Sequence, residues 1–530
     1  MRPLPDPTFE IAFIGSGISC TAVLMRLLDQ LLSKQESRPA RPVSIAVIDK
    51  DAEPWKGVPY GNRSSMHSLT ITTLGEFLPD SERGEFLNWL EAAWDGWRER
   101  LESEGGATGR SWLAGNEAMI AERRWEEMYV PRQLFGEYLQ EKITERITQA
   151  EDLNLVRVTF IQGYVTDLST NTRGEYEVAY QTASPGTGSL VADKVILCLG
   201  SPPIKSLDPQ GLLGPDRYIH DTYGPSVDHT LLRVRTALEG IESPAERNVL
   251  VLGSNASALE LLYLIQTTDS LRDLVGSVQM LSSSGQLPRR ITPGKQASFP
   301  FPHMTSLQQM KDFTAEDLMK ATREDIGLAE KYGVSIADAY GELSDLVIML
   351  IGRLPNGEKE KFHCYSGADY SRLIRRAGPE YRDAADRLQT ENRLRIWKGS
   401  FDRVLPGQSA GSGFRVSYIP SGASAPETLP DSFQLVINCG GFEELSGSSS
   451  SELIANLIRR NTVEVNCTGR GLRVSESFEA AERLYVMGPL LGGIFNNKSQ
   501  LWHVENAKSI FYLSALLVNE MMEALPADVD

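Results

Sequence analysis

A glycine turn between two apolar runs near the N-terminus constrains the fold of this chain most strongly. Residues 11–14 are all apolar, Gly15-Ser16-Gly17 follow at once, and residues 43–48 form a second, mostly apolar run. Between them, residues 21–32 carry apolar side chains at helical spacing. A buried strand, a helix and a second buried strand in this order predict a βαβ unit with parallel strands.

The residues of this turn suit a dinucleotide. The first glycine of such a turn makes it tight, the second admits a pyrophosphate, and a small third residue lets the helix pack on the strand. Here the third position is a cysteine, which is small enough to keep that packing. The helix N-terminus offers free N–H groups and a partial positive charge to phosphates. The expected binding residues are Gly15, Ser16, Gly17, Ile18, Ser19 and Cys20.

An acidic residue closes the second apolar run. We expect Asp49, followed by Lys50, to accept hydrogen bonds from the ribose hydroxyls of the cofactor. Asp49 lies 32 residues beyond Gly17, whereas about 20 is usual, and the polar stretch 33–42 accounts for the excess. The alternative is a strand, turn and helix that bind no ligand.

A second glycine turn begins at Gly253. It lies between the apolar run 248–252 and a helix expected to end near residue 266, and a further strand is expected over 278–281. Asn255 replaces the middle glycine, which makes close approach of a pyrophosphate less certain. The expected binding residues of this turn are Gly253, Ser254, Asn255, Ala256 and Ser257.

The residues after that strand favour NADPH over NADH. No carboxylate follows it; instead there are serines, among them Ser283, and then Arg289 and Arg290. Hydroxyl and guanidinium groups bind a 2′-phosphate that an acid would repel. A degenerate half that binds no nucleotide stays open as the alternative.

Composition excludes several classes of protein. The net charge of −17 disfavours nucleic acid and anionic membranes. No apolar run reaches membrane-spanning length, and the first ten residues show no leader peptide. The five cysteines lie far apart, so we expect free thiols, no metal site and a cytoplasmic protein.

The rest of the chain alternates between the two element types. We expect helices over 80–128 and from Pro131, and a charged helical insertion or lid over 304–350. A loop rich in Ser, Gly and Pro is expected over 406–430, and a final amphipathic helix over 500–522. The expected strands are 156–165, 175–180, 194–199, 435–438 and 484–487.

Further strings make the chain resemble a known family. It is similar to the bacterial FAD/NAD(P)-binding family of two-dinucleotide-binding-domain flavoproteins, related to the flavin-dependent N-hydroxylating monooxygenases. Besides the first turn and Asp49, the strings that carry the likeness are residues 56–61 with His67, and residues 129–139, 195–200, 485–489 and 502–507.

The resemblance implies an α/β fold with two Rossmann-like dinucleotide-binding domains of three-layer ββα type and a helical insertion. Residues 1–205 and 431–530 would form the FAD-binding domain, and residues 206–430 an NADPH-binding domain inserted into it. It further implies an oxidoreductase with FAD and NADPH as cofactors. Such an enzyme would hydroxylate a small polar substrate with O2, at an amine nitrogen, through a flavin C4a-(hydro)peroxide; a homo-oligomer is compatible with this.

The resemblance also implies site residues, each with a plainer alternative. His67 and Asn497 would be catalytic, although a lone histidine is more often structural. Arg132 would pair either with a cofactor phosphate or with Glu137. Trp502 would begin the last helix on its flavin side, or would be ordinary packing. The remaining cofactor-binding residues would be Gly57, Tyr60, Val165, Gly200 and Gly488.

Two other functions stay open. A decayed second half, which Asn255 suggests, would leave an FAD-dependent oxidase or dehydrogenase. A non-catalytic nucleotide-binding partner protein would use its acidic surface and insertion to bind another protein. For an enzyme, basic residues in and after the insertion are candidates for a substrate carboxylate, with solvated surface charge as the simpler interpretation. They are Lys320, Arg323, Arg372, Arg375 and Arg376.

Overall fold

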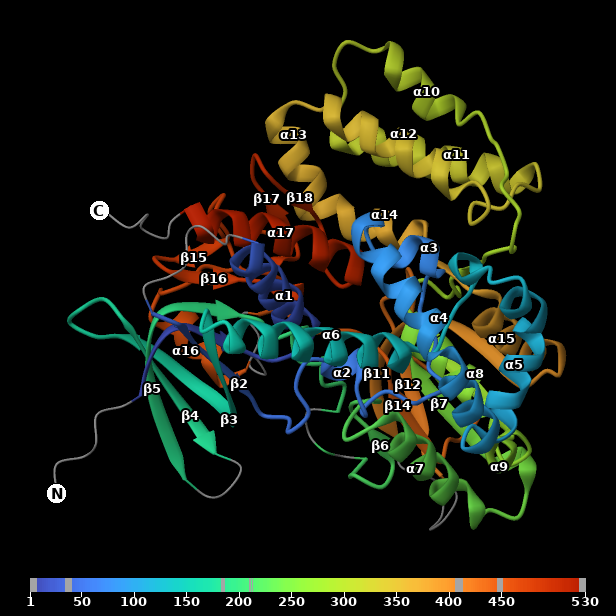
Figure 1. Ribbon diagram of the computed structural model, residues 1–530. Helices are drawn as coiled ribbons and strands as arrows, with labels where there is room; N and C mark the ends of the chain where they lie inside the picture. The colour runs from blue at the N-terminus through green and yellow to red at the C-terminus, as the bar shows by residue number, and fades with distance from the viewer. Residues whose placement is uncertain are drawn as a thin grey trace.

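The computed structural model contains two mixed β-sheets and a group of helices that stands apart from both (Figure 1). It describes residues 7–33, 41–182, 186–208, 211, 213–405, 413–445 and 451–523. Each sheet has seven strands among these residues. The α/β architecture with two Rossmann-like units confirms the predicted fold class.

The first sheet is built on the predicted N-terminal βαβ unit. Its central strand β1 pairs in parallel with β2 on one side and β5 on the other. A parallel strand inside a sheet is covered on both faces, and this explains why these runs are mostly apolar. The elements are β1 (Thr8–Ile14), α1 (Ile18–Ser33), β2 (Val43–Asp49), β3 (Val156–Thr170), β4 (Tyr176–Thr182), β5 (Thr187–Leu197), β15 (Glu479–Ala481) and β16 (Leu484–Val486).

Two long strands divide this sheet into two layers. The first part of β3 pairs in parallel with β2, whereas its second part pairs antiparallel with β4. Similarly, β5 first pairs antiparallel with β4 and then in parallel with β1. The antiparallel part forms the second β-layer of the expected ββα arrangement.

Helices cover the other face of the first sheet. α1 packs against both α6 and α17 and is buried on most sides. The helices of this half are α2 (Gly57–Tyr60), α3 (Leu74–Phe77), α4 (Asp80–Ser103), α5 (Gly106–Ala121), η1 (Trp125–Glu127), α6 (Arg132–Asp152), α16 (Glu452–Arg459), η4 (Pro489–Leu491) and α17 (Ala507–Glu523).

The second sheet repeats this plan. β7 pairs in parallel with β8 and β14, and β11 pairs first with β8 and then antiparallel with β12. The elements are β6 (Tyr218–Ile219), α7 (Val227–Glu239), η2 (Pro244–Glu246), β7 (Asn248–Leu252), α8 (Ala256–Thr267), α9 (Asp269–Arg272), β8 (Ser277–Ser282), α15 (Pro379–Thr390), β11 (Leu394–Leu405), β12 (Arg415–Pro420), β13 (Glu427–Thr428) and β14 (Leu435–Asn438).

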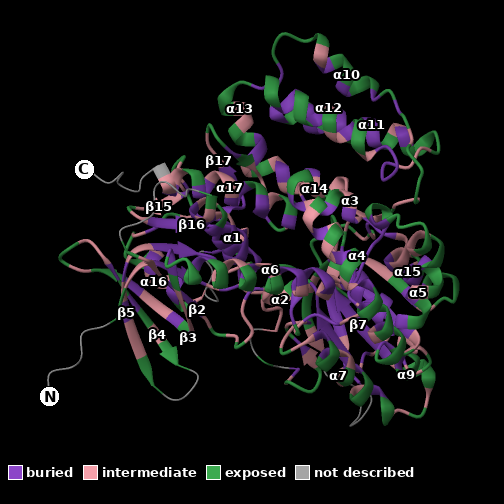
Figure 2. Cartoon of the chain, viewed as in Figure 1, coloured by how far each residue is buried: buried purple, intermediate pink, exposed green. Residues whose placement is uncertain are grey.

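The helical insertion follows β8 and has its own core. Its helices lie at one end of the molecule (Figure 1), and their outer faces are exposed (Figure 2). Buried side chains such as Leu318, Val347 and Phe362 form a cluster separate from the sheets. The elements are β9 (Arg289–Arg290), α10 (Pro302–Gln309), α11 (Ala315–Lys331), α12 (Tyr340–Arg353), α13 (Asn356–Lys361), η3 (Phe362–Ser366), α14 (Gly367–Leu373) and β10 (Arg376–Ala377).

Three expectations from the sequence are corrected. The loop expected over 406–430 contains β12 and β13, because Val416 and Tyr418 are buried in the second sheet; residues 406–412 lie outside the described part. β14 pairs with β7, so the second sheet extends past the boundary expected at residue 430. The last helix begins at Ala507 rather than near residue 500, because residues 500–501 pair with 494–495 as β18 (Gln500–Leu501) and β17 (Ile494–Phe495).

None of the helices within the described residues is long and apolar enough to cross a membrane.

Candidate functional site

The first glycine turn admits only glycine at Gly15. Its φ angle is +99°, and a Cβ there would lie 2.3 Å from the carbonyl oxygen of Cys198. Its N–H donates to the carbonyl of Ile48 over 2.7 Å. The turn is therefore fixed against the ends of both strands that flank β1, and a side chain has no room.

A second segment crosses the turn at Gly17. A Cβ on Gly57, whose φ is +64°, would lie 3.0 Å from the Cα of Gly17. The N–H of Trp55 donates to the carbonyl of Ser16 over 2.7 Å. The hydroxyl of Thr21 donates to the carbonyl of Trp55 over 2.8 Å. The string that begins at residue 56 is thus part of the same site, and the two glycines let the backbones approach closely.

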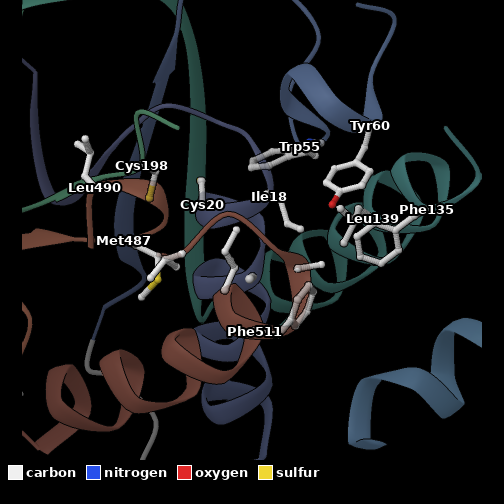
Figure 3. Packing of buried hydrophobic residues seen from close by; sticks show 14 of the residues in the cluster. Ile18, Cys20, Trp55, Tyr60, Phe135, Leu139, Cys198, Met487, Leu490 and Phe511 are labelled. Atoms are coloured by element: carbon white, nitrogen blue, oxygen red, sulfur yellow. The ribbon is translucent and has the colours of Figure 1, made fainter. Parts of the chain in front are cut away.

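The start of α1 is tightly packed. Cys20 is fully buried, as expected for the small third residue of the turn. A Cβ on Gly488, which follows β16, would lie 2.1 Å from Oγ of Ser19. Surrounding buried side chains come from several distant segments (Figure 3). Because the first N–H groups of a helix lack helical acceptors and carry a partial positive charge, this glycine-lined end fits the pyrophosphate of FAD.

Asp49 is held at the end of β2 beside the turn. One carboxylate oxygen accepts from the N–H of Ser16 over 2.6 Å and from its hydroxyl over 2.8 Å. The other oxygen accepts from the N–H of Asp51 over 2.9 Å. This places a carboxylate where the ribose of a nucleotide bound at the turn is expected. Most of the polar stretch invoked for the long spacing, residues 34–40, lies outside the described residues.

The other residues expected at the first site have varied surroundings. Lys50 is exposed and its carbonyl accepts from Gln162, whereas Val165 is buried in β3 and Tyr60 packs edge-on against Phe135. Gly200 follows β5 with a φ of +75°. Burial raises the pKa of Tyr60 to about 12, so its hydroxyl is neutral. Their cofactor contacts stay predictions.

The second glycine turn has the same geometry as the first. Gly253 has a φ of +110°, and a Cβ there would lie 2.2 Å from the carbonyl oxygen of Cys439. Its N–H donates to the carbonyl of Leu281 over 2.8 Å. A strand, a turn and two flanking strand ends therefore recur in the same relation as around Gly15.

Asn255 does not strain this turn. Its φ and ψ of −97° and −162° are extended backbone, which requires no glycine. Its side-chain oxygen accepts a hydrogen bond from Nη1 of Arg375. Next to it, the hydroxyl of Ser254 donates to the carbonyl of Gln286 over 2.8 Å and contacts Ser282. The substitution thus introduces a polar contact without distorting the backbone.

The arginines expected to bind a 2′-phosphate are already paired. Arg289 contacts Glu330 at 2.6 Å, and Arg290 contacts Asp383 at 2.7 Å. Ser283 is exposed in the turn after β8. The expected role of these three residues stays a prediction, and both arginines would have to share their carboxylate partners with the phosphate.

Arg132 joins the two halves of the molecule. Two hydrogen bonds of 2.8 Å link its Nη2 to the carboxylate of Glu260 in α8, and both side chains are largely buried. Burial opposes its charge, but Glu260 together with Tyr223 and Tyr381 outweighs this and raises the pKa of Arg132. The expected pairing with Glu137 is wrong, because Glu137 lies further along α6 and pairs with Arg100.

The same carboxylate holds the segment that carries His67. The hydroxyl of Ser68 donates to Glu260 over 2.8 Å, and the N–H of Leu69 donates to the hydroxyl of Tyr381 over 2.8 Å. His67 is half-buried, and burial lowers the pKa of its imidazole against the opposing effect of Asp228. Within the described residues its ring has no hydrogen-bond partner, so a neutral imidazole is free to bind or to exchange a proton.

Two of the expected site residues near the C-terminus, Asn497 and Trp502, form hydrogen bonds with side chains of other segments. Asn497 is exposed and its amide donates to Glu476. Trp502 precedes the last helix instead of beginning it, and its indole N–H donates to Ser371 over 2.7 Å. Its ring packs on Phe362 of the insertion. Trp502 therefore anchors the insertion to the first half of the molecule, and no contact joins Asn497 to His67 in the described part.

A disulfide reinforces this junction. Cys364 of η3 is bonded to Cys467, so the expectation of five free thiols is wrong for these two. The residues are 103 positions apart in the sequence, and only the fold brings them together. Cys20, Cys198 and Cys439 are buried free thiols, and burial raises the pKa of each.

Several residues at the junction were not singled out from the sequence. They are Glu260 and Tyr223, which accept hydrogen bonds from the Arg132 guanidinium, and Tyr381, whose hydroxyl donates to Glu260. Glu260 could have been recognised from the sequence, because it is the single charged residue of the apolar helix α8. In the structure it is almost completely buried. A buried charge needs a partner, so this position alone predicts an ion pair.

Comparisons with known proteins show what this chain is similar to. A family model described as FAD-NAD(P)-binding matches residues 12–202. Uncharacterized proteins of Mycobacterium bovis and Mycobacterium tuberculosis are 34% identical over 525 residues, which cover 99% of this chain and 97% of each relative.

Solved structures share the fold across the whole chain. The reduced form of ornithine hydroxylase from Pseudomonas aeruginosa matches with a TM-score of 0.55 at 12% identity, covering 98% of this chain and 100% of that one. The FAD-bound cadaverine monooxygenase of desferrioxamine biosynthesis from Erwinia amylovora also gives 0.55 at 12% identity, covering 99% and 97%. L-lysine 6-monooxygenase from Pseudomonas syringae gives 0.50 at 15% identity, covering 98% and 100%.

Proposed function

Because this chain belongs to the FAD-NAD(P)-binding family, with FAD and a nicotinamide dinucleotide as its cofactors, we propose that it is an FAD-dependent, NADPH-driven monooxygenase. Its substrate is a small polar molecule that it hydroxylates at an amine nitrogen with O2. The FAD part comprises residues 1–205 and the chain after β14, and the NADPH part lies between them.

The observation that carries this proposal is the repeated turn. Gly15 and Gly253 each have a positive φ, and a Cβ on either would meet a strand-end carbonyl, at 2.3 Å and 2.2 Å. A chain with two such turns is equipped for two dinucleotides, which a hydride transfer from NADPH to a flavin requires. The buried pair of Arg132 and Glu260 holds the two parts together.

The reaction type rests on the fold relatives. Solved structures similar in shape include an ornithine hydroxylase, a cadaverine monooxygenase and a lysine 6-monooxygenase, each named for an amine-bearing substrate. Fold alone does not specify chemistry. The likeness nevertheless supports a primary amine as the first substrate class to test.

The residues of this chain would bind and orient the cofactors. The first turn of α1 would bind the FAD pyrophosphate, and Asp49 would accept from the ribose hydroxyls. Residues 55–57 lie against this turn and would exclude water from it. When bound, FAD accepts hydride from NADPH and activates O2. The second turn would bind NADPH at the start of α8.

His67 is the proposed proton carrier. Its lowered pKa keeps the imidazole neutral at pH 7, where it can accept a proton. The anchored neighbours Ser68 and Leu69 fix its backbone against the NADPH part. Asn497 is kept as a second candidate, although its amide is turned to Glu476.

Three measurements test the proposal. NADPH should bleach the flavin of the purified protein in a stopped-flow experiment, and a panel of primary amines should contain one that stimulates NADPH oxidation and O2 uptake. Product analysis should then show a hydroxylamine. Bleaching by substrate but not by NADPH would favour an oxidase or dehydrogenase, and a protein that cannot be loaded with flavin would refute the proposal.

A further inference from the structure

We propose that Arg375 binds the pyrophosphate of the second dinucleotide and thereby compensates for the absence of the middle glycine at Asn255. The inference rests on the proposed function, because it concerns how NADPH is held. It assigns a specific anion-binding role to Arg375, one of the basic residues that the sequence analysis named as candidates for binding a substrate carboxylate.

The backbone fixes Arg375 beside the second turn. Its carbonyl accepts from the N–H of Arg289 over 2.8 Å, and the next two residues pair in parallel with β9. After the insertion helices, the chain thus returns at this residue to a short two-stranded sheet with β9, which follows β8. A side chain on such a paired segment is presented to the turn without the entropy cost of ordering a loop.

The side chain of Arg375 reaches Asn255, the position of the turn at which a pyrophosphate is expected to approach. Nη1 of Arg375 donates to the side-chain oxygen of Asn255, the residue in the place of the middle glycine. In the first turn, the equivalent residue Gly17 is met by the backbone of Gly57 instead. The second turn therefore replaces a backbone approach by a side-chain pair, Asn255 with Arg375.

Arg375 differs from the neighbouring arginines in its ion pairs. Its neighbours Arg289, Arg290 and Arg376 each form an ion pair, with Glu330, Asp383 and Glu76. No carboxylate of the described residues forms an ion pair with Arg375.

The surroundings of Arg375 are cationic as well. Burial and then the nearby Arg372 lower the pKa of its guanidinium, and Arg470 adds to this against the opposing Glu505. Positive charges gathered around a half-buried guanidinium favour an anionic ligand, because such a ligand relieves their mutual repulsion.

A guanidinium suits this ligand. Arginine has five N–H donors in a rigid fork and binds phosphate oxygens in pairs. The bond to Asn255 uses one donor and orients the fork, so the other donors are available. A substrate carboxylate has similar chemistry, and the experiment must separate these two sources of negative charge.

The test compares two ligands on FAD-loaded protein. NADP+ contains the pyrophosphate, whereas adenosine 2′-monophosphate contains only the 2′-phosphate part. Isothermal titration calorimetry gives the dissociation constant of each for wild type, Arg375→Gln and Arg375→Lys. Arg98→Gln is the matched control, because it removes the same charge from an exposed side chain of α4 that pairs with Glu102.

We expect Arg375→Gln to weaken NADP+ binding about 10- to 100-fold, the loss of a charged hydrogen bond to phosphate. Binding of adenosine 2′-monophosphate should change by less than about twofold, as should NADP+ binding to the Arg98→Gln control. Arg375→Lys should lie between, because it keeps the charge and loses the fork.

Other outcomes overturn the inference. Unchanged NADP+ affinity in Arg375→Gln would do so, and a raised KM for the stimulating amine in that variant would assign the guanidinium to substrate instead. If wild type binds no NADP+, the proposed function fails as well. If wild type binds NADP+ and NADPH bleaches its flavin while Arg375→Gln is unaffected, the role of Arg375 alone is refuted.

Discussion

The ion pair of Arg132 and Glu260 gives the sharpest test of how the two nucleotide-binding parts are joined. Their side chains are 11% and 5% exposed, so both charges are removed from water. Glu260 also accepts from Ser68 and lies within hydrogen-bond reach of Tyr223. Replacing it by leucine leaves the guanidinium of Arg132 buried without a counter-charge.

The expected cost of Glu260→Leu is about 3–5 kcal/mol in the free energy of unfolding, the usual effect of removing one partner from a buried pair. The double variant Arg132→Leu with Glu260→Leu removes both charges. It should regain most of this loss, since an apolar pair of similar volume is often as stable as a buried ion pair.

Equilibrium urea unfolding, followed by circular dichroism, measures these differences. Glu102→Gln is the matched control, because Glu102 pairs with Arg98 on the exposed face of α4, where the two side chains are 51% and 60% exposed. An exposed pair of this kind contributes less than about 1 kcal/mol. The reasoning would be refuted if Glu260→Leu cost no more than the control, or if the double variant were less stable than Glu260→Leu.

Two further predictions concern the first turn and the junction with the insertion. Gly15→Ala places a Cβ 2.3 Å from a carbonyl oxygen and should purify with little or no FAD, whereas Gly84→Ala, with open space around it, should keep the flavin-to-protein absorbance ratio of wild type. An unchanged ratio in Gly15→Ala would contradict the assignment of the turn. Burial lowers the pKa of His363 to about 4, so the folded state resists protonation and stability is lost as pH falls below about 6.5. Relative to wild type, His363→Phe should therefore gain about 2 kcal/mol in unfolding free energy between pH 7 and pH 5, and a constant difference would speak against this.

Local features were predicted from the sequence because they depend on neighbours in the chain. Gly15 and Gly253 need positive φ angles, and the apolar runs around them can be buried only as strands in a sheet. Asp49 follows its strand directly, so its place beside the first turn is set by topology. β14 is also a short, fully buried apolar run, and its bounds were predicted correctly.

Other elements were not predicted, because their composition is not typical of a strand or a helix. β12 lies in a stretch rich in Ser, Gly and Pro, and its strand character comes from pairing with β11. The internal repeat carried a signal for it, because the first half has β4 in the equivalent place. Trp502 was assigned to the last helix, since apolar spacing does not reveal that a short hairpin precedes that helix.

The family, its two cofactors and the two glycine turns were thus determined by the sequence alone. Only the tertiary structure decided how the two halves meet. Arg132 finds Glu260 across 128 residues, and Arg375 finds Asn255 across 120. Periodicity and spacing describe which face of an element is buried, but a charge paired over such separations depends on how whole elements pack. The first turn is therefore evident in the sequence, whereas the partner of the second turn could be identified only after the insertion had been placed against it.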